Sequence, residues 1–89
     1  MGTLLIPAKV YFDDFSFDLL EYQVHRNSQN IGTYSGLINK DELGNHIAFL
    51  LECDIKPNDI LSCNNKTYIV SDIDYDYYDG NPEILKAYF

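Results

Sequence analysis

The sequence predicts a mainly β protein, a small antiparallel β-barrel or sandwich of five to seven short strands in one domain, residues 1–89. First, short apolar or alternating runs recur along the chain, separated by turn residues such as Gly, Pro, Asn and Asp. Second, eight Tyr and five Phe make the chain 15% aromatic, and aromatic side chains favour pleated, half-buried surfaces. Third, 89 residues are enough for one domain with a small core but not for two.

The N-terminal part of the chain has patterns that fit more than one element. Residues Leu4–Phe12 read as a strand, in which Pro7 would confine part of the segment to a sheet edge. The segment near residues 14–24 fits either a strand or one short helix capped by Asp13 and Asp14. The spacing of Phe17, Leu20 and Val24 favours a helix. The alternation of Phe15, Phe17 and Leu19 favours a strand. We favour the strand, because a helix there would begin with aromatic residues and contain few strong helix formers.

Two further strands are predicted in the middle of the chain. One spans Ile31–Asn39, where Gly32 and Gly36 mark a β-bulge or a close approach of the backbone. After a turn at residues 40–45, the apolar run His46–Glu52 is bounded by turn residues. Its length and boundaries are typical of a buried strand.

The C-terminal half reads as a series of β-hairpins. Pro57 fixes its own φ and restricts the residue before it, so residues 54–59 are expected to form a tight connection. Asn64 and Asn65 tolerate positive φ, which a two-residue hairpin turn demands. Another turn is indicated at residues 78–82 by Asp-Gly and Asn-Pro pairs. The strands predicted between and after these turns lie at residues 60–63, 66–76 and 83–89.

The balance of charge argues against one class of partner. The chain has 14 acidic and 6 basic residues, a formal net charge of −8, and the basic residues form no cluster. Because binding to a phosphate backbone needs Lys and Arg to replace counterions, we expect no direct nucleic-acid binding. An acidic surface instead fits a basic protein partner, or serves solubility alone.

The distribution of apolar residues predicts a cytoplasmic protein. No run approaches the ~20 apolar residues of a membrane helix, and residues 1–7 lack the basic segment of a signal peptide. We therefore expect no association with a membrane. Cys53 and Cys63 could pair, but in an unexported chain reduced core thiols are the more frequent outcome.

One acidic stretch bears on metal binding. Asp72, Asp74 and Asp76 are spaced like the first ligands of an EF-hand calcium loop. However, Tyr77 occupies the sixth position, where that loop needs Gly, and strand alternation already places the three carboxylates on one solvated face. They are therefore weak candidates for a divalent-cation site, and we predict no metal or other cofactor.

No catalytic motif is evident. A zinc site built from His46, Cys53 and Cys63 would lack the paired ligands that zinc sites use. His25 falls in a polar stretch expected to be a solvated loop, and neither histidine lies in a motif with a nucleophile. We predict that the protein is not an enzyme.

Two segments of the second half resemble a family of phage proteins. The segments read Asp54-Ile55-Lys56-Pro57-Asn58-Asp59-Ile60 and Asn65-Lys66-Thr67-Tyr68-Ile69-Val70. They are similar to the I-x-P-G-D-x-I and G-x-x-Y-x-V stretches of small phage head–tail connector and neck proteins, with Asn58 and Asn65 in place of glycines. Residues 78–88 also resemble the last hairpin of those proteins, so the resemblance covers about residues 46–89.

The resemblance implies a small β-barrel that forms part of a ring in a phage particle, or the product of a prophage gene. It implies protein contacts rather than catalysis. We therefore expect a phage or prophage structural or assembly protein that self-associates or binds a protein partner, in the cytoplasm or in the virion. The alternative is an acidic inhibitor that mimics nucleic acid and blocks a host DNA-binding or defence protein.

Overall fold

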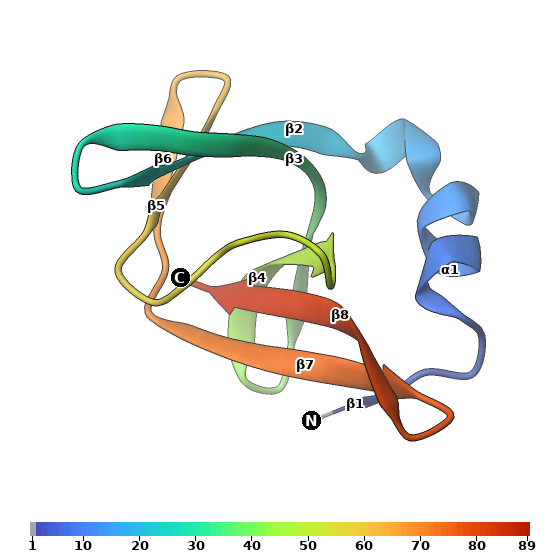
Figure 1. The fold of residues 1–89 in the computed structure, drawn as a ribbon. Helices are drawn as coiled ribbons and strands as arrows, with labels where there is room; N and C mark the ends of the chain where they lie inside the picture. The colour runs from blue at the N-terminus through green and yellow to red at the C-terminus, as the bar shows by residue number, and fades with distance from the viewer. Residues whose placement is uncertain (1) are drawn as a thin grey trace.

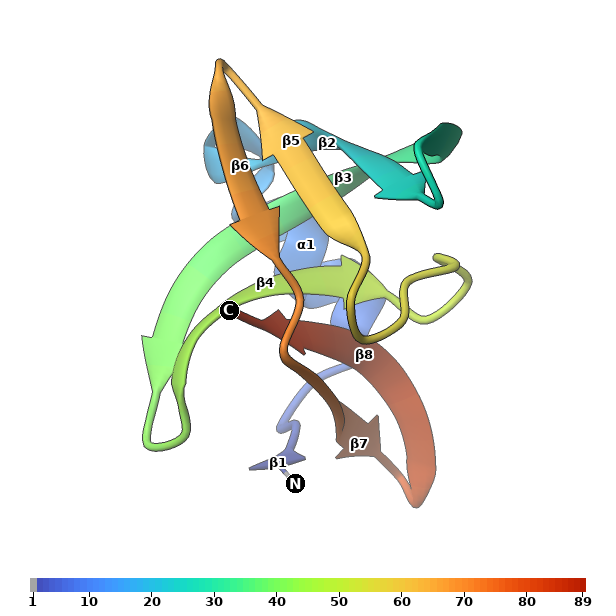
Figure 2. The same ribbon diagram turned by 90° about the vertical axis from the view of Figure 1, so that its left-hand side faces the viewer.

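The computed structural model describes residues 2–89 and confirms a mainly β fold (Figure 1). The elements are β1 (Gly2–Thr3), α1 (Ala8–Asp14), the 3-10 turn η1 (Ser16–Asp18), β2 (Leu20–Arg26), β3 (Gln29–Asp41), β4 (Gly44–Leu50), β5 (Ile60–Cys63), β6 (Lys66–Ile69), β7 (Asp72–Tyr78) and β8 (Asn81–Tyr88). The strands form one sheet in the order β1-β7-β8-β4-β3-β2-β5-β6. All neighbours are antiparallel except β1 and β7, and Figure 2 shows the sheet curling into a barrel-like shape.

The long strand β3 turns the corner of this sheet. Its first part pairs with β2 as far as Leu20↔Gly36, and its second part pairs with β4 from Leu37↔Ala48 onward. A Cβ atom on Gly36 would lie 2.6 Å from Phe49 Cε1, so only glycine lets the backbone approach the core so closely. The close approach predicted at this glycine is confirmed.

A β-bulge lies near the other predicted glycine. Val24 pairs with Gly32, but the next residue, His25, pairs with Asn30, which leaves Ile31 as the extra residue in β3. The bulge strengthens the local twist and so contributes to the curl of the sheet.

The turns fall where the residue types predict them. Asn58, Asn64 and Asn65 have φ values of 75°, 50° and 65°, a region that Asn tolerates better than most residues. Two consecutive positive values at Asn64 and Asn65 fit a two-residue hairpin turn between β5 and β6. Asp79 and Gly80 take the same role between β7 and β8.

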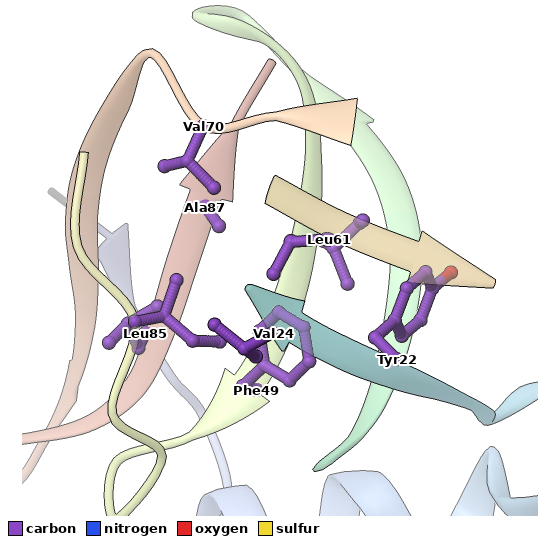
Figure 3. Packing of buried hydrophobic residues seen from close by; sticks show 9 residues of the cluster. Tyr22, Val24, Phe49, Leu61, Val70, Leu85 and Ala87 are labelled. Carbon is purple, nitrogen blue, oxygen red and sulfur yellow. The ribbon is translucent and has the colours of Figure 1, made fainter. Parts of the chain in front are cut away.

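The main core fills the inside of the curled sheet (Figure 3). The Tyr22 and Phe49 rings meet edge to face within it, with ring centroids 5.7 Å apart. The buried residues of this cluster are Tyr22, Val24, Ile47, Phe49, Ile55, Leu61, Val70, Leu85 and Ala87. Alternate residues of β2, β4 and β8 supply most of it, as the period of a strand requires.

The helix α1 covers the opposite face of β4 and β8. Ala8 and Phe12, one helical turn apart, pack against Ala48 and Ile84. Glu83 Oε1 accepts a hydrogen bond of 2.9 Å from the Ala8 amide at the start of the helix. Because both faces are covered there, four consecutive residues of β4 (His46–Phe49) are buried. The buried strand predicted at His46–Glu52 is confirmed, with its end at Leu50.

Three predictions about elements need correction. The strand predicted at Leu4–Phe12 is wrong throughout: β1 ends at Thr3, residues 4–7 belong to no strand, and α1 begins at Ala8, where its packing onto β4 and β8 overrides the alternating pattern. Near residues 14–24, the favoured strand is correct only from Leu20, where β2 begins. The alternative, a short helix, is limited there to the 3-10 turn η1 at Ser16–Asp18. The strand predicted at 66–76 is interrupted: the Val70 amide donates to the Asp59 carbonyl and the Ser71 amide to the Tyr88 carbonyl. The chain therefore passes from one half of the sheet to the other between these two residues.

Candidate functional site

The predicted acidic face lies on β7 but is only partly solvated. Asp76 Oδ1 lies 3.0 Å from Lys86 Nζ, and the Asp76 side chain is 19% exposed. Asp74 is the register partner of Lys86, and Asp72 that of Tyr88. Within residues 2–89, no group of three or more His, Cys, Asp and Glu side chains is placed to hold a metal ion. The carboxylates of β7 instead face the one cationic side chain of β8.

Lys86 is the centre of an outer polar cluster formed by Asp41, His46, Asp76, Lys86 and Tyr88. The Lys86 side chain is 7% exposed, and its Nζ lies 3.2 Å from Asp41 Oδ2 in addition to its contact with Asp76. The Tyr88 hydroxyl donates a hydrogen bond of 2.6 Å to the same Asp41 oxygen. His46 Nδ1 lies 3.8 Å from that oxygen, and its ring packs 4.9 Å from the Tyr88 ring. The cluster joins β3, β4, β7 and β8 on the face opposite the core.

Three groups of this cluster, Asp41, Lys86 and Tyr88, have pKa values shifted away from neutrality. The hydrogen bond from Tyr88, with help from the Leu43 amide and Lys86, holds the pKa of Asp41 well below its usual range. Burial alone would lower the pKa of Lys86, but its bonds to Asp76 and Asp41 outweigh burial and raise it. Burial, and next the bond to Asp41, raise the pKa of Tyr88. Because none of these three groups titrates near neutrality, the arrangement suits a structural tie better than proton transfer.

The other residues considered for metal binding or catalysis lie apart. His46 belongs to the outer polar cluster, whereas Cys53 and Cys63 are free thiols packed against the main core, on the other face of the sheet. Burial, with a smaller effect of nearby Glu52, raises the pKa of Cys53 to about 11, so its thiol stays protonated and poorly nucleophilic at neutral pH.

His25 lies in a strand, which corrects the solvated loop predicted for it. In β2 it is half-buried, and its Nε2 lies 3.1 Å from Ser62 Oγ. The hydrogen bonds of residues 2–89 include no carboxylate that orients the His25 ring, as a catalytic triad would require. This pair therefore links β2 to β5 without a third group that would orient the imidazole.

A second ionic cluster holds the Pro57 connection in place. Arg26 donates two parallel hydrogen bonds to Asp59, Nε to Oδ1 at 2.9 Å and Nη2 to Oδ2 at 2.8 Å. The Lys56 amide donates a third bond of 2.9 Å to Asp59 Oδ2, and exposed Asp54 lies 3.2 Å from Arg26 Nη2. The Arg26 bonds, followed by the Lys56 amide, lower the pKa of Asp59. The sequence predicted the turn but not its partner 33 positions earlier.

The most distinctive surface is apolar and surrounds α1 and η1. Half of the twelve exposed large hydrophobic residues in the described chain fall between positions 5 and 20: Leu5, Ile6, Val10, Phe15, Phe17 and Leu20. The Phe17 side chain is fully exposed. Shortly before Phe17 in the sequence, the Tyr11 and Phe15 rings pack together with centroids 4.9 Å apart. Sequence reasoning missed this surface, because the residue types alone do not distinguish exposed from buried aromatic side chains.

Two hollows flank the helix on this surface. The first, with a volume of about 520 Å³, has an apolar lining formed by Ala8, Phe12, Leu50, Leu51 and Pro82. Lys9, Asp13, Glu52 and Glu83 complete that lining. The second, of about 350 Å³, is lined by Tyr11, Phe15, Asp18, Leu37, Ile38 and Asn39. We call α1, η1 and the two hollows the α1 face, and it is the candidate interaction site.

Comparison with known proteins gives no information about the α1 face. The chain matches no family model, no curated protein and no solved structure. No helix in residues 2–89 is long and apolar enough to cross a membrane.

Proposed function

We propose that the protein is a non-enzymatic structural or assembly protein of a phage or prophage that acts through protein–protein contacts. The observation that carries the proposal is the α1 face, where Phe15, Phe17 and their apolar neighbours are exposed. Exposed apolar side chains gathered in one part of a folded protein mark a candidate site of interaction. The resemblance of residues 46–89 to connector and neck proteins supplies the phage context.

The polar clusters support a structural role. Arg26 with Asp59, and Lys86 with Asp41 and Asp76, are ion pairs that hold strands and loops in fixed positions. A rigid sheet that carries one apolar face is suited to repeated contacts between subunits. Contacts between different faces of identical subunits close into rings when the rotation between them permits.

Sedimentation velocity over a range of concentrations tests this proposal, with the protein alone and mixed with the products of neighbouring genes. We expect self-association or a complex, weakened by Phe17→Ser. Ile69→Ser is the matched control, because Ile69 is 65% exposed and belongs to β6. That strand lies away from α1 in Figure 1. A strictly monomeric protein that binds none of those products would contradict the proposal.

The net charge of −8 favours a second candidate, an acidic inhibitor that mimics nucleic acid and blocks a host DNA-binding or defence protein. Affinity capture from a host lysate tests it. Recovery of a basic nucleic-acid-binding protein, released by competing DNA, is the expected result. Recovery of no such protein would remove this candidate.

A further inference from the structure

The α1 face combines apolar hollows with an acidic border. Asp13, Glu52 and Glu83 line the first hollow and Asp18 the second, whereas Lys9 is the one basic residue in either lining. Glu83 is already engaged with the Ala8 amide, so Asp13, Asp18 and Glu52 remain to meet a partner. All three are exposed.

The composition of this face disfavours two kinds of occupant. Apolar linings such as Phe12, Leu50 and Leu51 have no complement on a phosphate backbone, and the acidic border repels one. A second copy of the chain would bring its own net charge of −8 and its own acidic border to the contact. Like charges placed opposite each other disfavour that association.

Charge complementarity therefore selects a partner with apolar side chains flanked by bases. An amphipathic helix presents this pattern, because residues three and four apart share one face. Apolar side chains on one face can enter the hollows on the two sides of α1, while Lys and Arg beside them approach Asp13, Asp18 and Glu52. Grooves lined by apolar residues bind amphipathic helices in this manner.

We propose that the α1 face binds a basic amphipathic helical segment of a partner protein. This inference rests on the proposed function, since it names the chemistry of the partner that a protein-contact role requires. Phe15 and Phe17 provide the apolar contacts. The exposed carboxylates orient the basic helix and raise its rate of association.

The test uses a synthetic helical peptide with Leu and Phe on one face and Lys on the other, titrated into the labelled protein at two salt concentrations. We expect saturable binding that weakens as salt rises, because exposed charges are screened. Phe17→Ser should raise the Kd about tenfold, as loss of an apolar anchor does. Asp13→Asn combined with Glu52→Gln should raise the Kd and reduce its dependence on salt.

Matched controls separate specific binding from general attraction. Ile69→Ser and Asp79→Asn change exposed residues outside the α1 face and should leave the Kd unchanged. A scrambled peptide of equal composition tests whether the apolar face of the helix matters. Equal binding of the scrambled peptide, or no effect of Phe17→Ser, would overturn the inference.

The same samples separate failure of the inference from failure of the proposed function. Absence of peptide binding, together with self-association that Phe17→Ser abolishes, would assign the face to a second copy. That result overturns the basic partner and retains a protein-contact function. Absence of both, with no complex with neighbouring gene products, overturns both proposals.

Discussion

Asp59 shows how one side chain can determine the shape of a loop. It is 2% exposed and accepts hydrogen bonds from two Arg26 nitrogens and from the Lys56 amide. A buried carboxylate needs such partners, because an unsatisfied charge is costly away from water. The sequence pattern around Pro57 predicted the tight turn, but the Arg26 partner depends on strand β2 folding back onto β5, a contact that local patterns do not encode.

Replacement of Asp59 tests this role against its neighbour Asp54. Asp59→Ala removes the buried charge-assisted bonds and leaves the Lys56 amide unsatisfied, so we expect a loss of about 3 kcal/mol in the free energy of unfolding. Asp54→Ala removes the other carboxylate that contacts Arg26, and the Asp54 side chain is 56% exposed. This change should lower the free energy of unfolding by less than about 1 kcal/mol. Urea unfolding of both variants measures the difference. Equal losses would show that burial of Asp59 is not what makes it important.

At the scale of elements, β3 was predicted better than α1 for a physical reason. The glycines of β3 are signals that the chain itself carries, since a missing side chain permits a bend wherever the strand lies. The seven residues of α1 carry no such signal, and no side chain caps the helix at Pro7. A helix this short depends on tertiary packing, which Ala48, Ile84 and Glu83 supply from more than 30 residues away.

The bend of β3 predicts the effect of one added methyl group. In Gly36→Ala the new Cβ would lie 2.6 Å from Phe49 Cε1 and 2.7 Å from Ile47 Cγ2, and both side chains are fully buried. Because neither can move freely, we expect a loss of about 1–3 kcal/mol in the free energy of unfolding. Exposed Ser35 on the same strand is the control, and Ser35→Ala should change stability by less than about 0.5 kcal/mol. Similar stability of both variants in chemical denaturation would argue against a tight corner.

At the scale of the whole molecule, the outer polar cluster links strands that are far apart in sequence. Asp41 and Lys86 are 45 residues apart, yet they meet because β4 lies between β3 and β8 in the sheet. The alternation of β7 correctly placed Asp72, Asp74 and Asp76 on one face. It could not show that Lys86 faces them, because that requires the register between β7 and β8. The curled sheet was therefore predictable in outline, whereas its ionic contacts and the α1 face were not.

The lowered pKa values of Asp41 and Asp59 predict how the whole protein responds to acid. A carboxylate whose pKa is lower when folded stabilises the protein above its unfolded pKa, about 3.9, and loses that contribution as pH falls through the folded value. We expect stability to be nearly constant from pH 7 to about 5 and to fall below about 4. Thermal unfolding as a function of pH measures this.

Asp41→Asn isolates one of the two carboxylates in that experiment. The variant should be less stable than the native protein at pH 7, and the difference should shrink as the pH falls below about 4. A difference that stays constant with pH would mean that Asp41 contributes through shape and hydrogen bonding rather than through its charge.

The passage of β3 through both halves of the sheet has a consequence for cooperativity. Its backbone bonds join β2 on one side of the corner and β4 on the other, so neither half can separate without disturbing the strand that holds the other. We expect the sheet to open as one unit, with its central amides protected from hydrogen exchange until global unfolding. The short helix α1, held mainly by side-chain packing, can open locally while that unit stays intact. The α1 face would then be able to change conformation when it binds a partner, while the sheet beneath it keeps its structure.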